Sequence, residues 1–203
     1  MKFNKSFSVL IALILLFSVN ISAQRLNPKL KSKDHKIRRL VVLPAKVELM
    51  RSGMKGAEPM EKEAAEITPV LEEVVAKVFE KKNFIVARDT FNEQALQSDE
   101  KMRYALADLQ RNFDEMALKM YRKQKDIEKG RFTLGDQVLL LNQDDQTDAY
   151  VFIRARGMQT TKGKVAFAVV MLNPLIAIPA CVVWVTIVDA RTGEVLAHTQ
   201  TVT

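Results

Sequence analysis

Short apolar runs and helical periodicities alternate along the first half of this chain. Residues 40–43 and 84–87 are wholly apolar runs, which are typical of strands buried on both faces of a sheet. Between them, apolar residues recur at three- and four-residue spacing, at Ile67, Val70, Leu71, Val74, Val75, Val78 and Phe79. This spacing predicts a helix whose regular part begins near Thr68 and which ends at residues 81–83. The preceding turn over residues 60–66 could also be helical, up to a kink. A strand, a helix and a strand in this order predict a right-handed crossover and parallel pairing.

A longer helical pattern follows. Apolar residues at alternating steps of four and three, with one more seven positions on, form a heptad-like seam: Met102, Leu106, Leu109, Phe113, Met116, Met120 and Ile127. The seam predicts one helix of about 25 residues that ends at Gly130. A helix lying across a sheet and a dimeric coiled coil both fit this seam. We expect the first, because it is the commoner arrangement.

The last third of the chain is rich in β-branched and aromatic residues, which favour strands. We expect four strands there, at residues 149–156, 165–172, 182–188 and 195–202. Residues 189–194 are expected to form a hairpin turn in which Gly193 adopts a positive φ. Residues 165–188 carry no charge, so a membrane-spanning or membrane-docking segment is an alternative. An Asn-Pro pair and a second proline at its centre favour two buried strands joined by a connection.

Together these elements predict one α/β domain over residues 40–203. It contains a mixed β-sheet of about five to six strands and about two or three packed helices, one of them long. Residues 45–58 contain two glycines and are expected to form a loop between the first strand and the first helix. The alternative is that residues 47–49 extend the first strand.

The N-terminal segment has the pattern of a secretory signal peptide. Two lysines precede an uncharged, mostly apolar stretch over residues 7–19, which ends in small and polar residues up to Ala23. We expect residues 1–23 to be cleaved off between Ala23 and Gln24, which places the protein in the periplasm or outside the cell. An uncleaved anchor in the inner membrane is the alternative, because more cations follow the apolar stretch than precede it.

Positive charge is concentrated directly after this segment. Residues 24–39 hold one acidic residue, Asp34, and seven cations: Arg25, Lys29, Lys31, Lys33, Lys36, Arg38 and Arg39. The full chain has a net charge of +7, so the rest of the mature chain is near neutral. We expect residues 24–39 to be a flexible basic arm that contacts an acidic partner or an anionic membrane surface. Nucleic acid is not expected as a partner, because the arm has no Phe, Trp or Tyr on which bases stack.

No motif along the chain predicts catalysis. Cys181 is the single cysteine and lies in an apolar run, and the two histidines, His35 and His198, are far apart in sequence. These residues have no metal-ligand spacing, and the glycines form no phosphate-binding fingerprint. We therefore expect a protein that is not an enzyme, with no catalytic residues, no cofactor and no bound metal.

Four segments resemble a group of bacterial envelope proteins. They are RRLVVLPAKVE (38–48), FEKKNFIV (79–86), TDAYVFIRARG (147–157) and VWVTIVDARTGEVL (183–196). In their order and residues they are similar to the CsgG-like and TolB N-terminal-like periplasmic domains. The resemblance implies helices packed on a mixed sheet and a non-enzymatic role in an envelope assembly. The long methionine-rich helix departs from the family pattern, and no cysteine for a lipid anchor follows the leader.

These observations lead to one main hypothesis and two alternatives. The main hypothesis is an exported, non-catalytic accessory or adaptor protein that binds a partner in a cell-envelope assembly or transport system. Its basic arm would act as a tether, and the helix over residues 97–129 would offer a contact face. A membrane-anchored or membrane-docked protein would instead use an uncleaved N-terminal segment or residues 165–188. A small-ligand-binding periplasmic module would use the loop at 45–58 as the mouth of its pocket.

Overall fold

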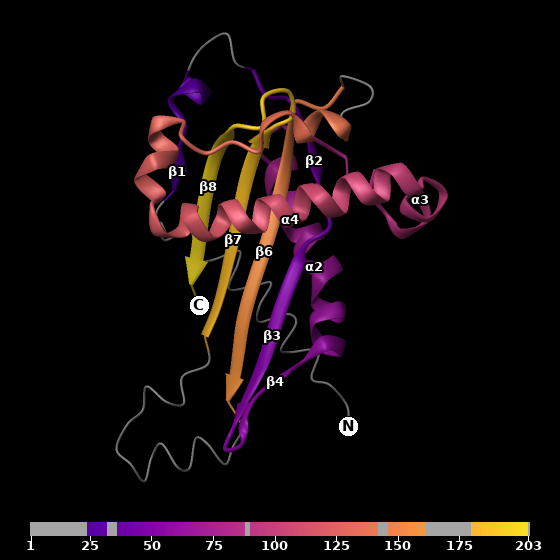
Figure 1. Cartoon of the computed structure of the whole chain (residues 1–203), viewed down its shortest axis with the longest axis vertical. Coiled ribbons are helices and arrows are strands. Elements are labelled where there is room, and N and C mark those ends of the chain that lie inside the picture. Colours follow the sequence, from indigo (N-terminus) through magenta and orange to yellow (C-terminus); the bar gives the residue numbers. More distant parts are fainter. Residues whose placement is uncertain (1–23, 32–35, 88–89, 142–145, 161–179, 203) are drawn as a thin grey trace.

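A mixed β-sheet forms the centre of the molecule in the computed structural model (Figure 1). The structure describes residues 24–31, 36–87, 90–141, 146–160 and 180–202. Within these ranges the sheet has eight strands. Six of them follow the order β1 (Arg25–Leu26), β8 (Val195–Val202), β7 (Ala180–Asp189), β6 (Ala149–Thr160), β2 (Arg39–Val42) and β5 (Ile85–Ala87). The mixed α/β fold class predicted from the sequence is confirmed.

The central strand β6 has two parallel neighbours on one side. β2 pairs with residues 149–151 of β6, and β3 (Lys46–Gly53) pairs with residues 154–160. The chain passes from β2 to β3 through Pro44, which has no N–H for a ladder hydrogen bond. β7 runs antiparallel along the other side of β6. β5 pairs parallel with β2, as the strand–helix–strand order predicts.

Residues 45–58 do not form the expected loop. They form most of a β-hairpin, in which β3 pairs antiparallel with β4 (Gly56–Pro59) and Gly56 adopts a φ of 127° at the turn. The loop prediction was wrong, whereas the alternative of a strand through residues 47–49 is present, because β3 begins only two residues after Pro44 and continues along the same neighbour, β6. Its mixed polar and apolar sequence therefore belongs to a strand with one uncovered face.

Two long helices lie on opposite faces of the sheet (Figure 1). α2 (Glu61–Glu80) packs on one face and α4 (Glu100–Arg122) lies across the other. α2 begins at Glu61, so the regular helix starts earlier than predicted and includes the preceding turn over residues 60–66 that the sequence left open as helical. Pro69 removes a single backbone donor from this helix. One residue earlier, the Thr68 hydroxyl donates to Ala64 O, 2.8 Å away. Asn83, with a φ of 67°, follows the end of the helix, as expected.

The heptad-like seam is buried against the sheet, which confirms a helix lying across strands. Its buried members are Leu106, Leu109, Phe113, Met116, Met120 and Ile127. The ring of Phe113 stacks on Phe152 of β6, with centroids 4.1 Å apart. α4 ends at Arg122, however, and Ile127 lies in a separate 3-10 helix, η2 (Gln124–Lys129), which Gly130 closes with a φ of 63°. The predicted single helix was therefore too long at its C-terminal end.

Neighbouring residues of β6 point to opposite faces of the sheet. Tyr150 and Phe152 belong to the core under α4, whereas Val151 and Ile153 belong to the core under α2. All four are at most 1% exposed. Because helices cover both faces here, the first half of this strand is apolar at successive positions.

The β7–β8 hairpin forms at residues 189–194, as predicted. The Asp189 carboxylate accepts hydrogen bonds from the N–H groups of Arg191 and Thr192, each at 2.8 Å. Gly193 adopts a φ of 69°, and a Cβ added there would lie 2.5 Å from the carbonyl oxygen of Gly135. Glycine is therefore required at this turn by both conformation and space.

Three short helices complete the described structure: η1 (Pro28–Lys31), α3 (Glu93–Ser98) and η3 (Gly135–Leu140). The strand expected at 165–172 and the connection after it lie outside the described residues. Among the helices that the structure does describe, none has both the length and the apolar character needed to cross a membrane.

Candidate functional site

Part of the predicted basic arm lies against the folded body. Arg25 is in β1, which pairs antiparallel with β8, and its guanidinium donates to Glu128 at 2.8 Å. Lys29 is in η1 and pairs with Glu194 at 2.6 Å. Between them, Asn27 is buried and its side-chain amide donates to a carbonyl of β8 at 3.1 Å. These contacts attach the start of the arm to the edge of the sheet.

Three more of the predicted contact residues, Lys36, Arg38 and Arg39, lie at or just before the start of β2. The backbone N–H groups of Arg38 and Arg39 donate to the carboxylate of Asp148 at 2.8 and 2.9 Å. The Arg39 side chain also donates to Gln146 at 2.7 Å, whereas the side chains of Lys36 and Arg38 are exposed. Gln24 is exposed as well. Ala23, Lys33 and the side chain of Lys31 lie outside the described residues, so the roles predicted for them stay predictions.

A different surface stands out, because α4 covers only part of its face of the sheet. Figure 1 shows β3, β6 and β7 extending beyond the helix. The strand register arranges the side chains of the part that α4 does not cover in rows across the strands. The rows are Lys46, Arg154, Trp184 and Gln200 beside α4, then Glu48, Arg156, Val182 and Val202, then Met50 and Met158. We call these ten residues the open face.

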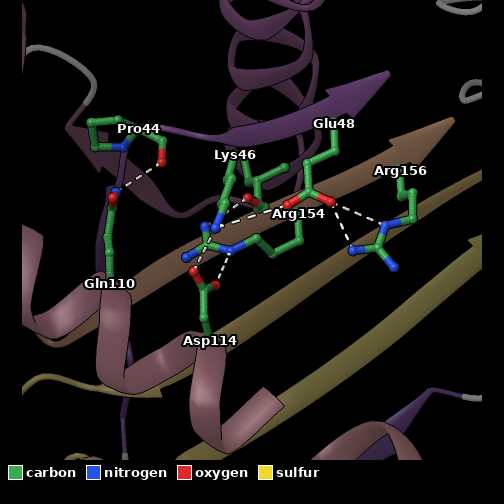
Figure 2. A network of polar contacts seen from close by, with 8 residues as sticks. Pro44, Lys46, Glu48, Gln110, Asp114, Arg154 and Arg156 are labelled. Carbon is green, nitrogen blue, oxygen red and sulfur yellow. Dashed lines mark hydrogen bonds and ion pairs between the residues drawn. The ribbon is translucent and has the colours of Figure 1, made fainter. Parts of the chain in front are cut away.

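Asp114 of α4 joins the helix to the first row of the open face (Figure 2). Its Oδ2 accepts from Lys46 Nζ at 2.9 Å, and its Oδ1 accepts from Arg154 Nε at 2.7 Å. One helical turn earlier, Gln110 Nε2 donates to the carbonyl oxygen of Pro44 at 3.1 Å. Residues four apart lie on the same side of a helix. One side of α4 is therefore attached by polar contacts to both β3 and β6.

The second row continues this line of charges (Figure 2). Arg156 donates from Nε and Nη2 to Glu48 Oε2 at 3.1 and 2.7 Å, and Glu48 Oε1 lies 3.9 Å from Lys46 Nζ. The side chains of Arg156 and Glu48 are 68% and 43% exposed, so this pair adds little to stability. The ion pair instead holds the charged groups of Arg156 and Glu48 in fixed positions on the open face. Together with Asp114 and Arg154, the line has three cations and two carboxylates and is positive overall.

Arg154 is the buried centre of the line. It is 7% exposed, and its guanidinium carbon lies 5.1 Å from the centroid of the Phe113 ring. Its Nη2 is buried and has no hydrogen-bond partner within the described ranges. Burial, the largest single effect, would raise the pKa of Asp114, but the hydrogen bonds and charges of Lys46 and Arg154 together outweigh it and hold that pKa below its usual value.

An aromatic cluster borders the open face at the C-terminal end of α4. The ring of Tyr121 stacks on Trp184, with centroids 4.9 Å apart, and lies 5.6 Å from the ring of His198. His198 Nδ1 shares a 2.9 Å hydrogen bond with the hydroxyl of Thr186. Burial lowers the pKa of His198 to about 4 and raises the pKa of Tyr121 to about 12. Both groups are uncharged near neutral pH, so the cluster offers a packed aromatic surface and not an acid–base pair.

Apolar side chains are exposed beside these fixed charges. Met158 and Val202 are 46% and 56% exposed, and both lie on the open face. Aromatic residues, methionine and arginine are enriched in protein interfaces, and the open face contains all three. In the described part of the chain, no three or more His, Cys, Asp or Glu side chains are grouped so that they could hold a metal ion.

The open face was not among the contact residues predicted from the sequence. One signal for it is visible there, because Arg154 and Arg156 alternate with alanine in a strand and must share a face. Their partners Lys46 and Glu48 are about a hundred residues earlier, and only the parallel register of β3 with β6 brings them together.

Comparisons with known proteins find only distant similarity. No protein-family model matches the chain, and no curated protein matches it. Among solved structures, the lipoprotein GNA1162 from Neisseria meningitidis is similar with 11% identity and a TM-score of 0.40 over 81% of each chain. The C-terminal domain of LpoB from Salmonella enterica is similar with 11% identity and a TM-score of 0.32, over 95% of this chain and 91% of that one. Similarity at this level does not carry the function of either protein to this chain, and the resemblance to CsgG-like and TolB N-terminal-like domains stays a prediction.

Proposed function

We propose that this protein is an exported, non-catalytic accessory protein that binds another protein of the cell envelope through its open face. The signal-peptide pattern of residues 1–23 supports export, with cleavage between Ala23 and Gln24. The observation that carries the binding role is the open face itself, in which exposed apolar side chains lie beside a fixed line of charges.

The edge of β8 next to the open face suits an extended partner segment. β1 pairs only with Ala197 and His198, so within the described ranges residues 199–202 of β8 have no strand on their outer side. An unpaired strand edge offers N–H and C=O groups to an added strand. A strand added there would place alternate side chains beside Gln200 and Val202, at the margin of the open face.

The charges of the open face indicate the chemistry of this segment. Lys46, Arg154 and Arg156 outnumber the carboxylates Asp114 and Glu48, so an acidic segment is attracted and a basic one is repelled. The exposed Met158 and Val202 favour apolar side chains in the same segment. The proposed partner therefore presents an extended stretch that combines acidic and apolar residues.

Site-specific photo-crosslinking in cells tests the proposal. A photoreactive residue at Met158 or Val202 is expected to crosslink one discrete envelope protein. The same residue at Leu118, which is 66% exposed on α4, is the matched control and is expected not to crosslink it. Arg156→Glu should lower the yield from Met158, because it reverses a charge of the open face. Equal yields from all three positions, or crosslinks only between copies of this chain, would argue against an envelope partner at the open face.

Export is tested separately by the N-terminus of the cellular product. The proposal expects a periplasmic species that starts at Gln24. A membrane-bound species that keeps Met1 would instead support the anchored alternative.

A further inference from the structure

A second surface feature lies on the opposite face of the sheet, the one that carries α2. A groove of about 590 Å³ runs between the C-terminal end of α2 and the segment of β1 and η1. Its floor includes Leu40 of β2, Ile187 of β7 and Ala197 of β8. Val78 of α2 and Leu30 of η1 line its two sides. The volume lies within the range of about 300–1,000 Å³ that small-molecule sites usually have.

The groove exists because α2 does not cover this half of the sheet. Only Leu71 and Ala76 of α2 are buried, and Val78 is 43% exposed. Ile187 is only partly buried although it belongs to the core on this side. The groove therefore leaves apolar side chains of both the helix and the sheet open to a ligand.

The described residues that line the groove are mostly apolar. Of the thirteen lining residues, the four with polar side chains are Gln24, Lys36, Arg38 and Lys82. The floor strands β2, β7 and β8 are each paired with neighbouring strands, so they cannot take up a further strand here. A peptide in the groove would bury N–H and C=O groups without partners, at a cost of about 1–3 kcal/mol for each group. An acyl chain carries no such groups.

Three cations gather at one end of the groove. Lys36 and Arg38 immediately precede β2, and Lys82 lies just before β5. The N–H of Ile85 donates to Arg38 O at 2.8 Å, which holds these two segments side by side. In the described part of the chain, the side chains of Lys36, Arg38 and Lys82 form no ion pair with a carboxylate. Within the described residues, these three side chains are therefore available to an anionic group at this end of the groove.

We propose that this groove binds a single-chain amphiphile with an anionic head group, with a long-chain fatty acid anion as the simplest member of the class. The acyl chain lies along the floor between Val78 and Leu30, and the carboxylate lies among Lys36, Arg38 and Lys82. This site is independent of the open face, since the two lie on opposite faces of the sheet. Two of the cations predicted from the sequence as lipid contacts, Lys36 and Arg38, take part in it.

Calorimetric titration of the mature chain, residues 24–203, with monomeric detergents of one chain length tests the proposal. Dodecanoate is expected to bind saturably at one site, and dodecyltrimethylammonium about tenfold or more weakly, because its head group is cationic. Butyrate, which has the carboxylate without the chain, is expected not to bind. Equal affinities for the anionic and cationic detergents would overturn the proposal, and so would binding without saturation. Binding to phosphatidylglycerol vesicles without binding to dodecanoate would also overturn it and would indicate a membrane surface instead.

Two variants and two matched controls place the binding in the groove. Val78→Glu adds a charge to the apolar side, and Lys82→Glu reverses a charge at the rim. Each is expected to lower the affinity for dodecanoate about tenfold. Leu118→Glu and Lys101→Glu make the same changes on exposed positions of α4 and are expected to leave the affinity unchanged. Because Val78 and Lys82 are exposed, both variants should fold, which circular dichroism checks. Unchanged affinity in a folded Val78→Glu variant would overturn the proposal.

Discussion

The two long helices have similar apolar stripes but bury them to very different extents. α4 buries Leu106, Leu109, Phe113, Met116, Ala117 and Met120, whereas α2 buries only Leu71 and Ala76. Val70 and Val78, both part of the predicted stripe of α2, are 39% and 43% exposed. The comparison teaches that periodicity determines which side of a helix is apolar, while the placement of the helix on the sheet determines how much of that side is covered.

The difference follows from where each helix lies on the sheet. α4 crosses several strands, with Phe113 stacked on β6 and Tyr121 stacked on Trp184 of β7 (Figure 1). α2 lies nearer the β3–β5 side and is attached there through Glu72, which accepts a hydrogen bond from Ala45 N at 2.7 Å. We therefore expect α4 to supply more of the stability and α2 to leave surface for binding.

The largest loss of stability is expected from a substitution that removes the centre of the α4 seam. Phe113 is fully buried, so Phe113→Ala should lower the free energy of unfolding by about 3–5 kcal/mol through lost burial and an unfilled cavity. Val78→Ala on α2 should lower it by less than about 1 kcal/mol, because Val78 is already half exposed. Urea denaturation measures both. Similar losses in the two variants would show that the apolar stripe of α2 is buried as fully as that of α4, and would contradict the difference between the two helices.

The second prediction compares an ion pair beneath α4 with one on α2. Asp114→Ala leaves Lys46 and the buried Arg154 without their carboxylate, and should cost about 2–3 kcal/mol. Lys77→Ala removes a pair with Glu73 in which both side chains are more than half exposed, and should change stability by less than about 0.5 kcal/mol. The same denaturation experiment measures both. A loss below about 1 kcal/mol in Asp114→Ala would mean that the line of charges does not hold α4 to the sheet.

Much of this fold follows from local patterns in the sequence. The α4 seam, the buried strand around Val41 and the hairpin at Gly193 each have a signal within a few residues, and each is present in the structure. The strand–helix–strand order also predicts the parallel pairing of β2 with β5 correctly. These features depend on periodicity and on backbone conformation, which neighbouring residues determine.

The candidate sites depend on contacts between distant residues, and of their residues only Lys36 and Arg38 were among the contacts predicted from the sequence. Lys46 lies opposite Arg154 only in one register of β3 against β6. No pattern in the neighbouring residues of either strand specifies that register. Strand β1 has two residues, too few for any periodicity, so Arg25 was expected in a free arm. The groove was missed because the stripe of α2 predicts burial of Val78, and only the position of α2 on the sheet leaves it exposed.

The third prediction concerns the pH dependence of the core under α4. His198 is 1% exposed beneath Tyr121, and its pKa is lowered by burial from 6.5 to about 4. Below pH 6.5 the unfolded chain binds a proton that the folded protein does not, so stability is complete above this pH and falls as the pH decreases toward 4. The loss should be about 1–3 kcal/mol, measured by urea denaturation at several pH values.

His198→Gln is the matched control for this effect, because glutamine keeps a polar group near Thr186 without titrating in this range. The difference in stability between the two proteins should depend on pH between 6.5 and 4 and be constant above 6.5. The pKa of Asp114 is lowered from its ordinary value of 3.8, so its contribution to stability is lost only as the pH falls below about 3.8. Its effect therefore lies at lower pH than that of His198. Parallel pH curves for the two proteins would show that His198 is not held neutral by the α4 side of the core.

The smallest change in stability is expected from a substitution that tests whether α4 excludes water from the core beneath it. Tyr150 is fully buried, its hydroxyl has no hydrogen-bond partner within the described ranges, and burial raises its pKa. Tyr150→Phe removes a buried polar group that gains nothing from the fold, so it should leave stability unchanged or raise it by up to about 1 kcal/mol. Tyr104→Phe at an exposed position of α4 is the control and should have no effect. Thermal and urea denaturation measure both variants. A loss of more than about 1 kcal/mol in Tyr150→Phe would show that the hydroxyl has a partner such as a buried water, and that α4 leaves room for solvent above β6.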